Sequence, residues 1–106
     1  MVVGHPDYKN QRAKVPAQLE AMRAHYGELV LITLLGNGPS YVASGWAVEQ
    51  GVYFAEVPNL RGRYGAKHPY LAASAMLALR PALCVTFGAC PEAEAARAAG
   101  VPTYEV

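Results

Sequence analysis

The sequence predicts an α/β fold of the Rossmann-like, doubly wound type, in which helices cover both faces of one parallel five-stranded sheet. Two observations predict it. Residues 29–35 and 82–87 are continuous apolar runs that each end at a glycine, as strands buried on both faces do. Helical segments alternate with such runs along all 106 residues, so residues 1–106 form a single domain. The expected order of the strands across the sheet is 3-2-1-4-5.

The other elements follow from shorter patterns. Residues 52–57 form a third apolar run of the same kind, and residues 1–3 and 103–106 form short strands. The first helix ends at Gly27 and is predicted by one apolar face, made by Val15, Leu19, Met22 and Tyr26.

Caps and prolines place the remaining three helices. The second is expected over residues 40–50, with Ser40 as N-cap, Trp46 facing inward and Gly51 as C-cap. The third is expected over residues 69–79 and the fourth, rich in alanine, over residues 91–99. The face of the third helix that is expected to pack inward contains Leu71, Ala75 and Leu79.

The composition indicates self-association. Hydrophobic residues make up 53% of the chain and charged residues 16%, against about 25% charged in an average soluble protein. So little charge leaves apolar surface to share between subunits, and we expect a homo-oligomer, most simply a two-fold dimer. The net charge of +1 provides no basic field, so no strong nucleic-acid binding is expected.

Several classes of protein are not indicated by the sequence. The first residues lack the basic and apolar regions of a signal peptide, and the longest apolar run is far too short to cross a bilayer. Cys84 and Cys90 are too few for a disulfide scaffold and form no metal-binding pattern. We therefore expect a cytoplasmic protein without membrane contact, metal or cofactor.

In doubly wound sheets, ligands bind beside the switch point, at the carboxyl ends of the strands. The second strand is followed by glycines that turn the backbone at a helix N-terminus, an arrangement that suits an anion. These residues are Gly36, Asn37, Gly38, Pro39 and Ser40. Pro39 removes one backbone donor, and an ordinary strand-to-helix turn is the alternative that the sequence favours.

Candidate residues also follow the first and fourth strands. A histidine, a carboxylate and a phenol after the first strand suit a base or a ribose, although proline and aspartate also favour a plain turn. The candidates after the first strand are Gly4, His5, Asp7 and Tyr8. After the fourth strand, Gly88 permits close approach of a ligand to the backbone. Cys90 lies near a helix N-terminus, where a thiol pKa can be lowered, and an unreactive cysteine is the alternative.

The long connection before the third helix contains the one basic cluster of the sequence, made of Arg61, Arg63, Lys67 and His68. Guanidinium groups can clamp a phosphate, and equally they can keep a loop solvated. If a ligand binds, we expect Arg61, Arg63 or Lys67 to close over it. The sequence has no Walker A, zinc-ligand or nucleophile-elbow motif, so we assign no catalytic residue.

Several short motifs occur in an order typical of one known family. They are Gly4 with Asp7 and Tyr8, the helix segment 43–47 with Trp46, the strand from Gly51 to Pro58, Gly65, Met76-Leu77, Phe87 and Ala99-Gly100-Val101-Pro102. This set resembles the SLOG superfamily, the Rossmann-like domains related to DprA/Smf and to the LOG cytokinin-activating enzymes, and within it the small stand-alone YspA-like members. The resemblance covers essentially the whole chain.

The departures from the family fall on its functional motifs. Its acidic residue after the second strand is Ser40 here, its Arg-Asn pair is Ala72-Ala73, and its phosphate loop retains only Gly88. The resemblance implies a sensor-type module for a nucleotide or nucleotide derivative, with an eroded phosphate site. A structural or interaction protein, of phage origin for example, that has lost the pocket is the alternative. A LOG-type nucleoside-monophosphate phosphoribohydrolase is disfavoured, because its chemistry needs a placed carboxylate and a phosphate cradle.

Overall fold

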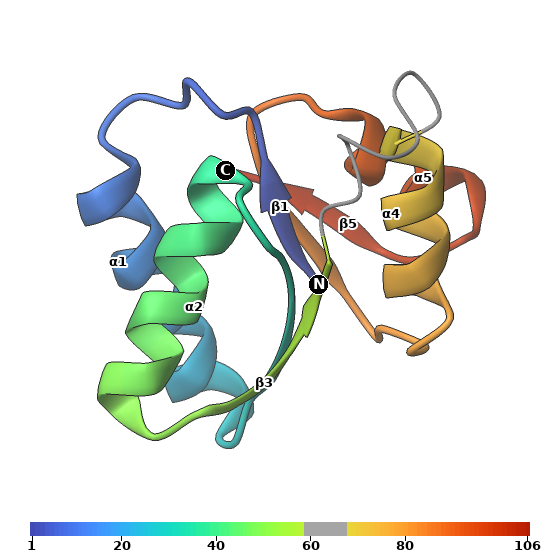
Figure 1. Cartoon of the computed structure of the whole chain (residues 1–106). Helices are drawn as coiled ribbons and strands as arrows, with labels where there is room; N and C mark the ends of the chain where they lie inside the picture. The colour runs from blue at the N-terminus through green and yellow to red at the C-terminus, as the bar shows by residue number, and fades with distance from the viewer. Residues whose placement is uncertain (59–67) are drawn as a thin grey trace.

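The structure is a computed structural model that describes residues 1–58 and 68–106 (Figure 1). Strands and helices alternate along the chain, as the sequence predicts. Their bounds are β1 Val2–Gly4, α1 Gln11–Tyr26, β2 Val30–Leu34, α2 Gly38–Gln50, β3 Tyr53–Val57, α4 His68–Leu77, β4 Cys84–Phe87, α5 Pro91–Ala98 and β5 Thr103–Glu105. The mixed α/β class is therefore confirmed.

The strands pair in parallel, but they form two sheets instead of one. β1, β4 and β5 form a three-stranded sheet in that spatial order, and β2 pairs with β3. β1 lies beside β2, yet no backbone ladder joins these two described strands. The neighbour relations of the order 3-2-1-4-5 are thus present, while the prediction of one continuous five-stranded sheet is wrong.

Two polar side chains explain the break between the sheets. The Leu35 N–H bonds to β3, so the N–H of Leu34 points to the opposite edge of β2, toward β1. There it donates to Ser40 Oγ at 2.6 Å instead of to a carbonyl of β1. The carbonyl of Gly4 in β1 accepts from Asn37 Nδ2 at 2.9 Å. Asn37 and Ser40 therefore take the hydrogen bonds that would join β1 to β2 at this end.

Helices cover both faces of the strands, as a doubly wound arrangement requires (Figure 1). On one side α1 and α2 bury Leu19 and Trp46 together with Val85 and Phe87 of β4. On the other side α4 and α5 enclose a second core cluster, to which Met76 and Ala93 belong. The two clusters lie on opposite faces, so the strands are buried between two helical layers.

The capping of α2 differs from the prediction, although its C-terminus does not. Asn37 is the N-cap, because its Oδ1 accepts from Ser40 N at 3.2 Å, and the helix begins at Gly38. The prediction of Ser40 as N-cap is wrong, since its hydroxyl turns back to β2. Gly51 ends α2 with φ of 67°, and Gly27 ends α1 with φ of 83°, both in the region that favours glycine.

α4 packs inward with a different face from the predicted one. Leu71 and Leu79 are 39% and 50% exposed, and Ala75 is also exposed. The buried side chains are Ala72, Ala73 and Met76. The two small alanines allow close contact between α4 and α5. Both sides of this helix contain apolar residues, so the periodicity of the sequence does not show which side packs inward.

Two further positions that the sequence assigns to the core are exposed. β3 pairs with β2 alone, and only Val57 at its end is fully buried, whereas Tyr53 is 76% exposed. Tyr26, at the end of α1, is 61% exposed. An apolar strand at the edge of a sheet has the same sequence pattern as a central strand, because its composition does not show which strands lie beside it.

Candidate functional site

The loops that follow β1, β2 and β4 meet at one edge, as the sequence predicts. His5 N donates to Phe87 O at 2.9 Å, and Asn37 Nδ2 bonds to Gly4 O across to the β2 loop. The predicted ligand residues at this edge, in the loops and in the adjoining ends of β1 and α2, are Gly4, His5, Asp7, Tyr8, Gly36, Asn37, Gly38, Ser40 and Gly88. Arg61, Arg63 and Lys67 lie outside the described residues.

Asn37 and Ser40 bind groups of their own chain. Asn37 is 9% exposed and Ser40 is fully buried. The Asn37 amide donates to Gly4 O and accepts from Ser40 N, while Ser40 Oγ accepts from Leu34 N. The polar atoms that suggested an anion site are therefore engaged in holding β1, β2 and α2 together.

A side chain that the sequence did not single out packs beside Gly38, the first residue of α2. A Cβ atom added at Gly38 would lie 2.7 Å from Gln11 Oε1 and 2.8 Å from Pro6 O. Gln11 Nε2 donates to Pro6 O at 3.2 Å, so the Gln11 amide is held in place, and its Oε1 is buried without a partner. The Gln11 amide and the Pro6 carbonyl thus fill the space beside the first residue of α2. No motif marks Gln11 in the sequence.

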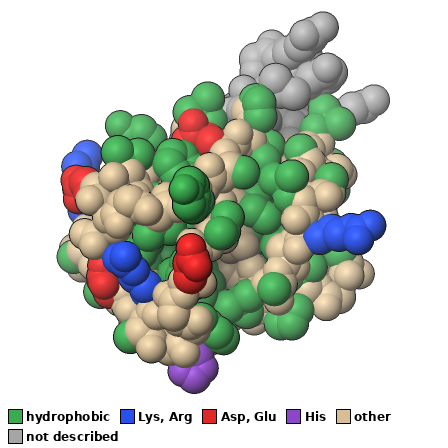
Figure 2. Space-filling view, turned by 90° about the horizontal axis from the view of Figure 1, so that it is seen from below, with side chains coloured by type: hydrophobic (Ala, Val, Ile, Leu, Met, Phe, Trp, Pro, Cys, Tyr) green, Lys and Arg blue, Asp and Glu red, His purple; other side chains and the backbone are tan. Residues whose placement is uncertain are grey.

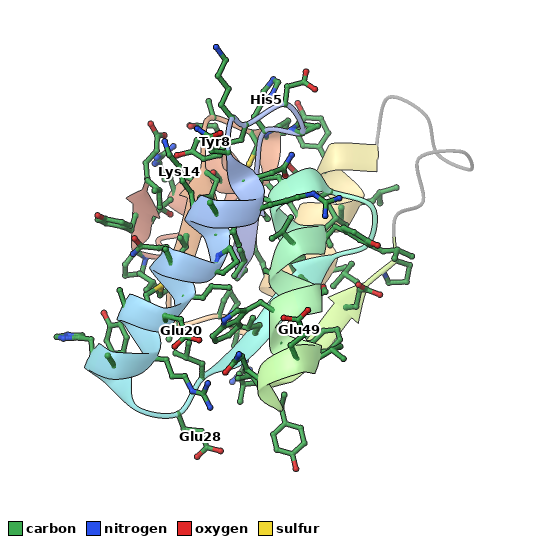
Figure 3. The ribbon with its side chains drawn as sticks, turned by 90° about the vertical axis from the view of Figure 1, so that its left-hand side faces the viewer. His5, Tyr8, Lys14, Glu20, Glu28 and Glu49 are labelled. Atoms are coloured by element: carbon green, nitrogen blue, oxygen red, sulfur yellow. The ribbon has the colours of Figure 1, made fainter. Side chains whose placement is uncertain are left out.

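The space above Gly88 is filled in the same way. Gly88 has φ of 85°, and an added Cβ would lie 3.3 Å from both His5 Cβ and Tyr8 Cδ2. The Tyr8 ring packs edge-on against Phe87, with ring centroids 5.7 Å apart, and Lys14 Nζ lies 5.4 Å from the Tyr8 centroid. Figure 3 shows His5, Tyr8 and Lys14 gathered at this end of the molecule. His5 and Tyr8 therefore pack against Gly88, which stays partly exposed.

Part of the predicted site stays open to solvent. His5, Asp7 and Gly36 are exposed. His5 Nδ1 accepts from Asp7 N at 3.1 Å, and Tyr8 N donates to His5 O at 3.0 Å, so these residues form a hydrogen-bonded turn. This geometry supports the turn interpretation of the segment, with the imidazole engaged by the backbone.

Two buried polar residues at the end of β4 were missed by sequence reasoning. Thr86 is fully buried, and its Oγ1 donates to Gly88 O at 2.5 Å and lies 3.6 Å from Cys90 Sγ. Glu92, in the first turn of α5, is 5% exposed. An acidic residue is common in the first turn of a helix, so its presence gave no signal of burial.

Cys90 has the environment of an unreactive thiol. It is 8% exposed, belongs to the core cluster beneath α4 and α5, and burial raises the pKa of its thiol above the ordinary value. Burial likewise raises the pKa of the Cys84 thiol. A reactive cysteine requires the opposite shift, so the geometry favours the unreactive alternative.

We expect iodoacetamide to modify Cys90 at least about 100-fold more slowly than free cysteine near neutral pH. The thiol reacts only when the protein opens locally, and a free energy of opening of about 3 kcal/mol lowers the rate by this factor. Mass spectrometry of timed samples measures the rate, and the urea-unfolded protein, in which both thiols should react fully, is the control. Rapid labelling of Cys90 in the folded protein would show that the site is activated.

Recesses lined by described residues include two that lie away from this edge. One lies between α1 and the β4–β5 edge and the other between α1, α2 and β3, with volumes of about 300 and 450 Å³. Within residues 1–58 and 68–106, no three His, Cys, Asp or Glu side chains gather as a metal site requires. None of the described helices is long and apolar enough to span a membrane.

Comparisons with known proteins found no similar protein. No protein-family model, curated protein or solved structure matches the chain.

Proposed function

We propose that this domain is an interaction module, in which the crevice of a nucleotide-binding type of fold is closed by the chain's own side chains. The observation that carries the proposal concerns Gly38 and Gly88, the two glycines where a ligand would come close to the backbone. The space beside each of them is filled by side chains of the same chain. Gln11 Oε1 lies against Gly38, and His5 with Tyr8 lies against Gly88. A domain whose crevice is occupied in this way acts through its outer surface.

The donors of the α2 N-terminus support this proposal. An anion cradle needs several free N–H groups that point into one space. Here Ser40 N and Tyr41 N bond to Asn37, and Pro39 has no N–H. Few donors remain for a phosphate, and the Gln11 amide lies beside Gly38 at this helix end.

Small-molecule binding, the function implied by the SLOG resemblance, is the competing candidate. In its favour, the loops after β1, β2 and β4 converge, and two helices, α2 and α5, begin directly after these strands. The exposed His5 and Asp7 also border this edge. A ligand would have to displace Gln11 or Tyr8 from their packed positions, so its affinity would be low.

Titration of the ¹⁵N-labelled protein with nucleotides tests the two candidates. We expect no saturable shift of the Gly4, Gly38 or Gly88 amide signals with nucleoside monophosphates, cyclic nucleotides or NAD up to about 1 mM, which means a binding free energy weaker than about 4 kcal/mol. Release of base from AMP is expected to be absent in the same samples.

Gln11→Ala distinguishes blocked binding from no binding, with Gln50→Ala, an exposed glutamine at the far end of α2, as the matched control. If nucleotides enter the crevice by displacing Gln11, Gln11→Ala should tighten their binding while Gln50→Ala leaves it unchanged. Sub-millimolar binding by the natural sequence, with shifts at the three glycines, would replace the interaction module by a ligand sensor.

A further inference from the structure

An apolar groove lies open between α1 and the β4–β5 edge of the three-stranded sheet. α2 packs on β1, β2 and β3, α1 packs on α2, and α5 covers β4 and β5 from the other side. The groove left between them has a volume of about 300 Å³. Its lining includes Ala21, Met22, His25 and Tyr26 of α1 with Leu83 and Tyr104, and we call it the α1–β5 groove.

The groove continues around the amino ends of the strands. A second recess of about 300 Å³ shares Met22, Tyr26 and Leu83 with the first. It adds Leu29, Val30, Pro81 and Ala82, which precede β2 and β4 or begin β2. Figure 2, which views the molecule from below, shows apolar side chains spread across this face. The two recesses therefore form one apolar surface.

The exposed area of this surface is large enough for a stable contact. Tyr26 is 61%, Val30 69% and Tyr104 53% exposed, so each tyrosine presents roughly 100 Å² to solvent. With the partly exposed side chains between them, the surface presents on the order of 700 Å², close to what one partner contributes to an interface of standard size.

The charge of the surface identifies a second copy of the chain as the occupant. Among the described residues that line the two recesses there is no Asp, Glu, Lys or Arg side chain, His25 is the only imidazole, and the Met1 ammonium donates to Leu83 O at 2.6 Å. A two-fold axis places a surface against itself, where any charged side chain would face its own copy. A surface without charged side chains avoids that repulsion, and it offers no partner group to a charged peptide or a nucleic acid.

We propose that two copies of this chain associate about a two-fold axis through the α1–β5 groove, with Tyr26 and Tyr104 of each copy packed against the groove of the other. The patch supplies both the projecting aromatic rings and the recess beside them, as an isologous interface requires. The inference rests on the proposed function, because it names the partner that the interaction module binds.

Sedimentation equilibrium of Tyr104→Lys tests the proposed interface. The natural sequence should have twice the 11.3 kDa chain mass at tens of micromolar, and the variant should dissociate with a dimer Kd at least about 30-fold higher. Tyr53→Lys is the matched control, because Tyr53 is an exposed tyrosine of the other edge strand and lies outside the groove. Circular dichroism verifies that both variants are folded.

Each outcome decides the inference separately from the proposed function. If the natural sequence is a monomer at about 200 µM, a concentration at which even weak interfaces form, the inference is overturned. It is also overturned if Tyr53→Lys dissociates the dimer and Tyr104→Lys does not. Nucleotide titration of the same samples tests the proposed function: a dimer that binds nucleotides at Gly38 overturns the interaction module and leaves the interface standing. A monomer that binds no nucleotide overturns the interface alone.

Discussion

Gly38→Ala is expected to lower the free energy of unfolding by about 2–3 kcal/mol, the usual cost of an added group in a packed site. The new Cβ would lie 2.7 Å from Gln11 Oε1 and 2.8 Å from the backbone oxygen of Pro6. The glutamine side chain can move aside. The Pro6 carbonyl belongs to the turn that joins β1 to α1, so it can move only if the whole turn moves. Urea unfolding followed by circular dichroism measures the change.

Gly45→Ala is the matched control, because it makes the same chemical change within the same helix. A Cβ at Gly45 would have no atom within 4 Å, and the residue lies in the interior of α2. Alanine is the better helix former by about 1 kcal/mol, so this variant should be more stable than the natural sequence. The two glycine variants should therefore change stability in opposite directions.

The comparison separates a filled crevice from an open one. In an open phosphate cradle, a methyl group at Gly38 would project into free space, and Gly38→Ala would cost ligand affinity with little loss of stability. Equal stability of the Gly38→Ala and Gly45→Ala variants would thus contradict the packing of Gln11 and Pro6 on α2. It would also reopen the crevice as a ligand site.

The sequence predicts the elements of this fold well because their signals are local. The apolar runs at residues 29–35 and 82–87 became β2 and β4, and the glycines at positions 27 and 51 ended α1 and α2. The break between the sheets was not predictable in this way. It depends on the side chains of Asn37 and Ser40 reaching Gly4 and Leu34, and such side-chain contacts to the backbone leave no periodic trace in the sequence.

The loops of the candidate site were predicted, but their use was not. Strand order alone brings the segments at His5, Asn37 and Gly88 to one edge, so their convergence follows from topology. Whether such loops hold a ligand or one another depends on which side chain enters the space. Here the Gln11 amide lies beside Gly38 and the Tyr8 ring beside Gly88, and neither a lone glutamine nor a tyrosine in a turn indicates such packing in sequence.

Ser40→Ala is expected to destabilise the protein by about 2 kcal/mol, within the range for stranding a buried donor. The Ser40 hydroxyl accepts from Leu34 N at 2.6 Å in a fully buried position, and no β1 carbonyl takes its place. Its removal leaves the Leu34 N–H without a partner at the end of β2. For a domain of this size, the loss corresponds to a fall in Tm of roughly 10 °C, measurable by thermal unfolding.

Ser74→Ala provides the comparison, since Ser74 is exposed on α4 and alanine favours a helix. Its stability should equal or slightly exceed that of the natural sequence. The result at Ser40 bears directly on function, because the sequence predicts Ser40 as a ligand-binding residue. A serine that served a ligand would be replaced at small cost to Tm, with the loss appearing in binding. A large fall in Tm, with nucleotide titrations unchanged from those of the natural sequence, would show that Ser40 joins β2 to α2 in place of the missing ladder.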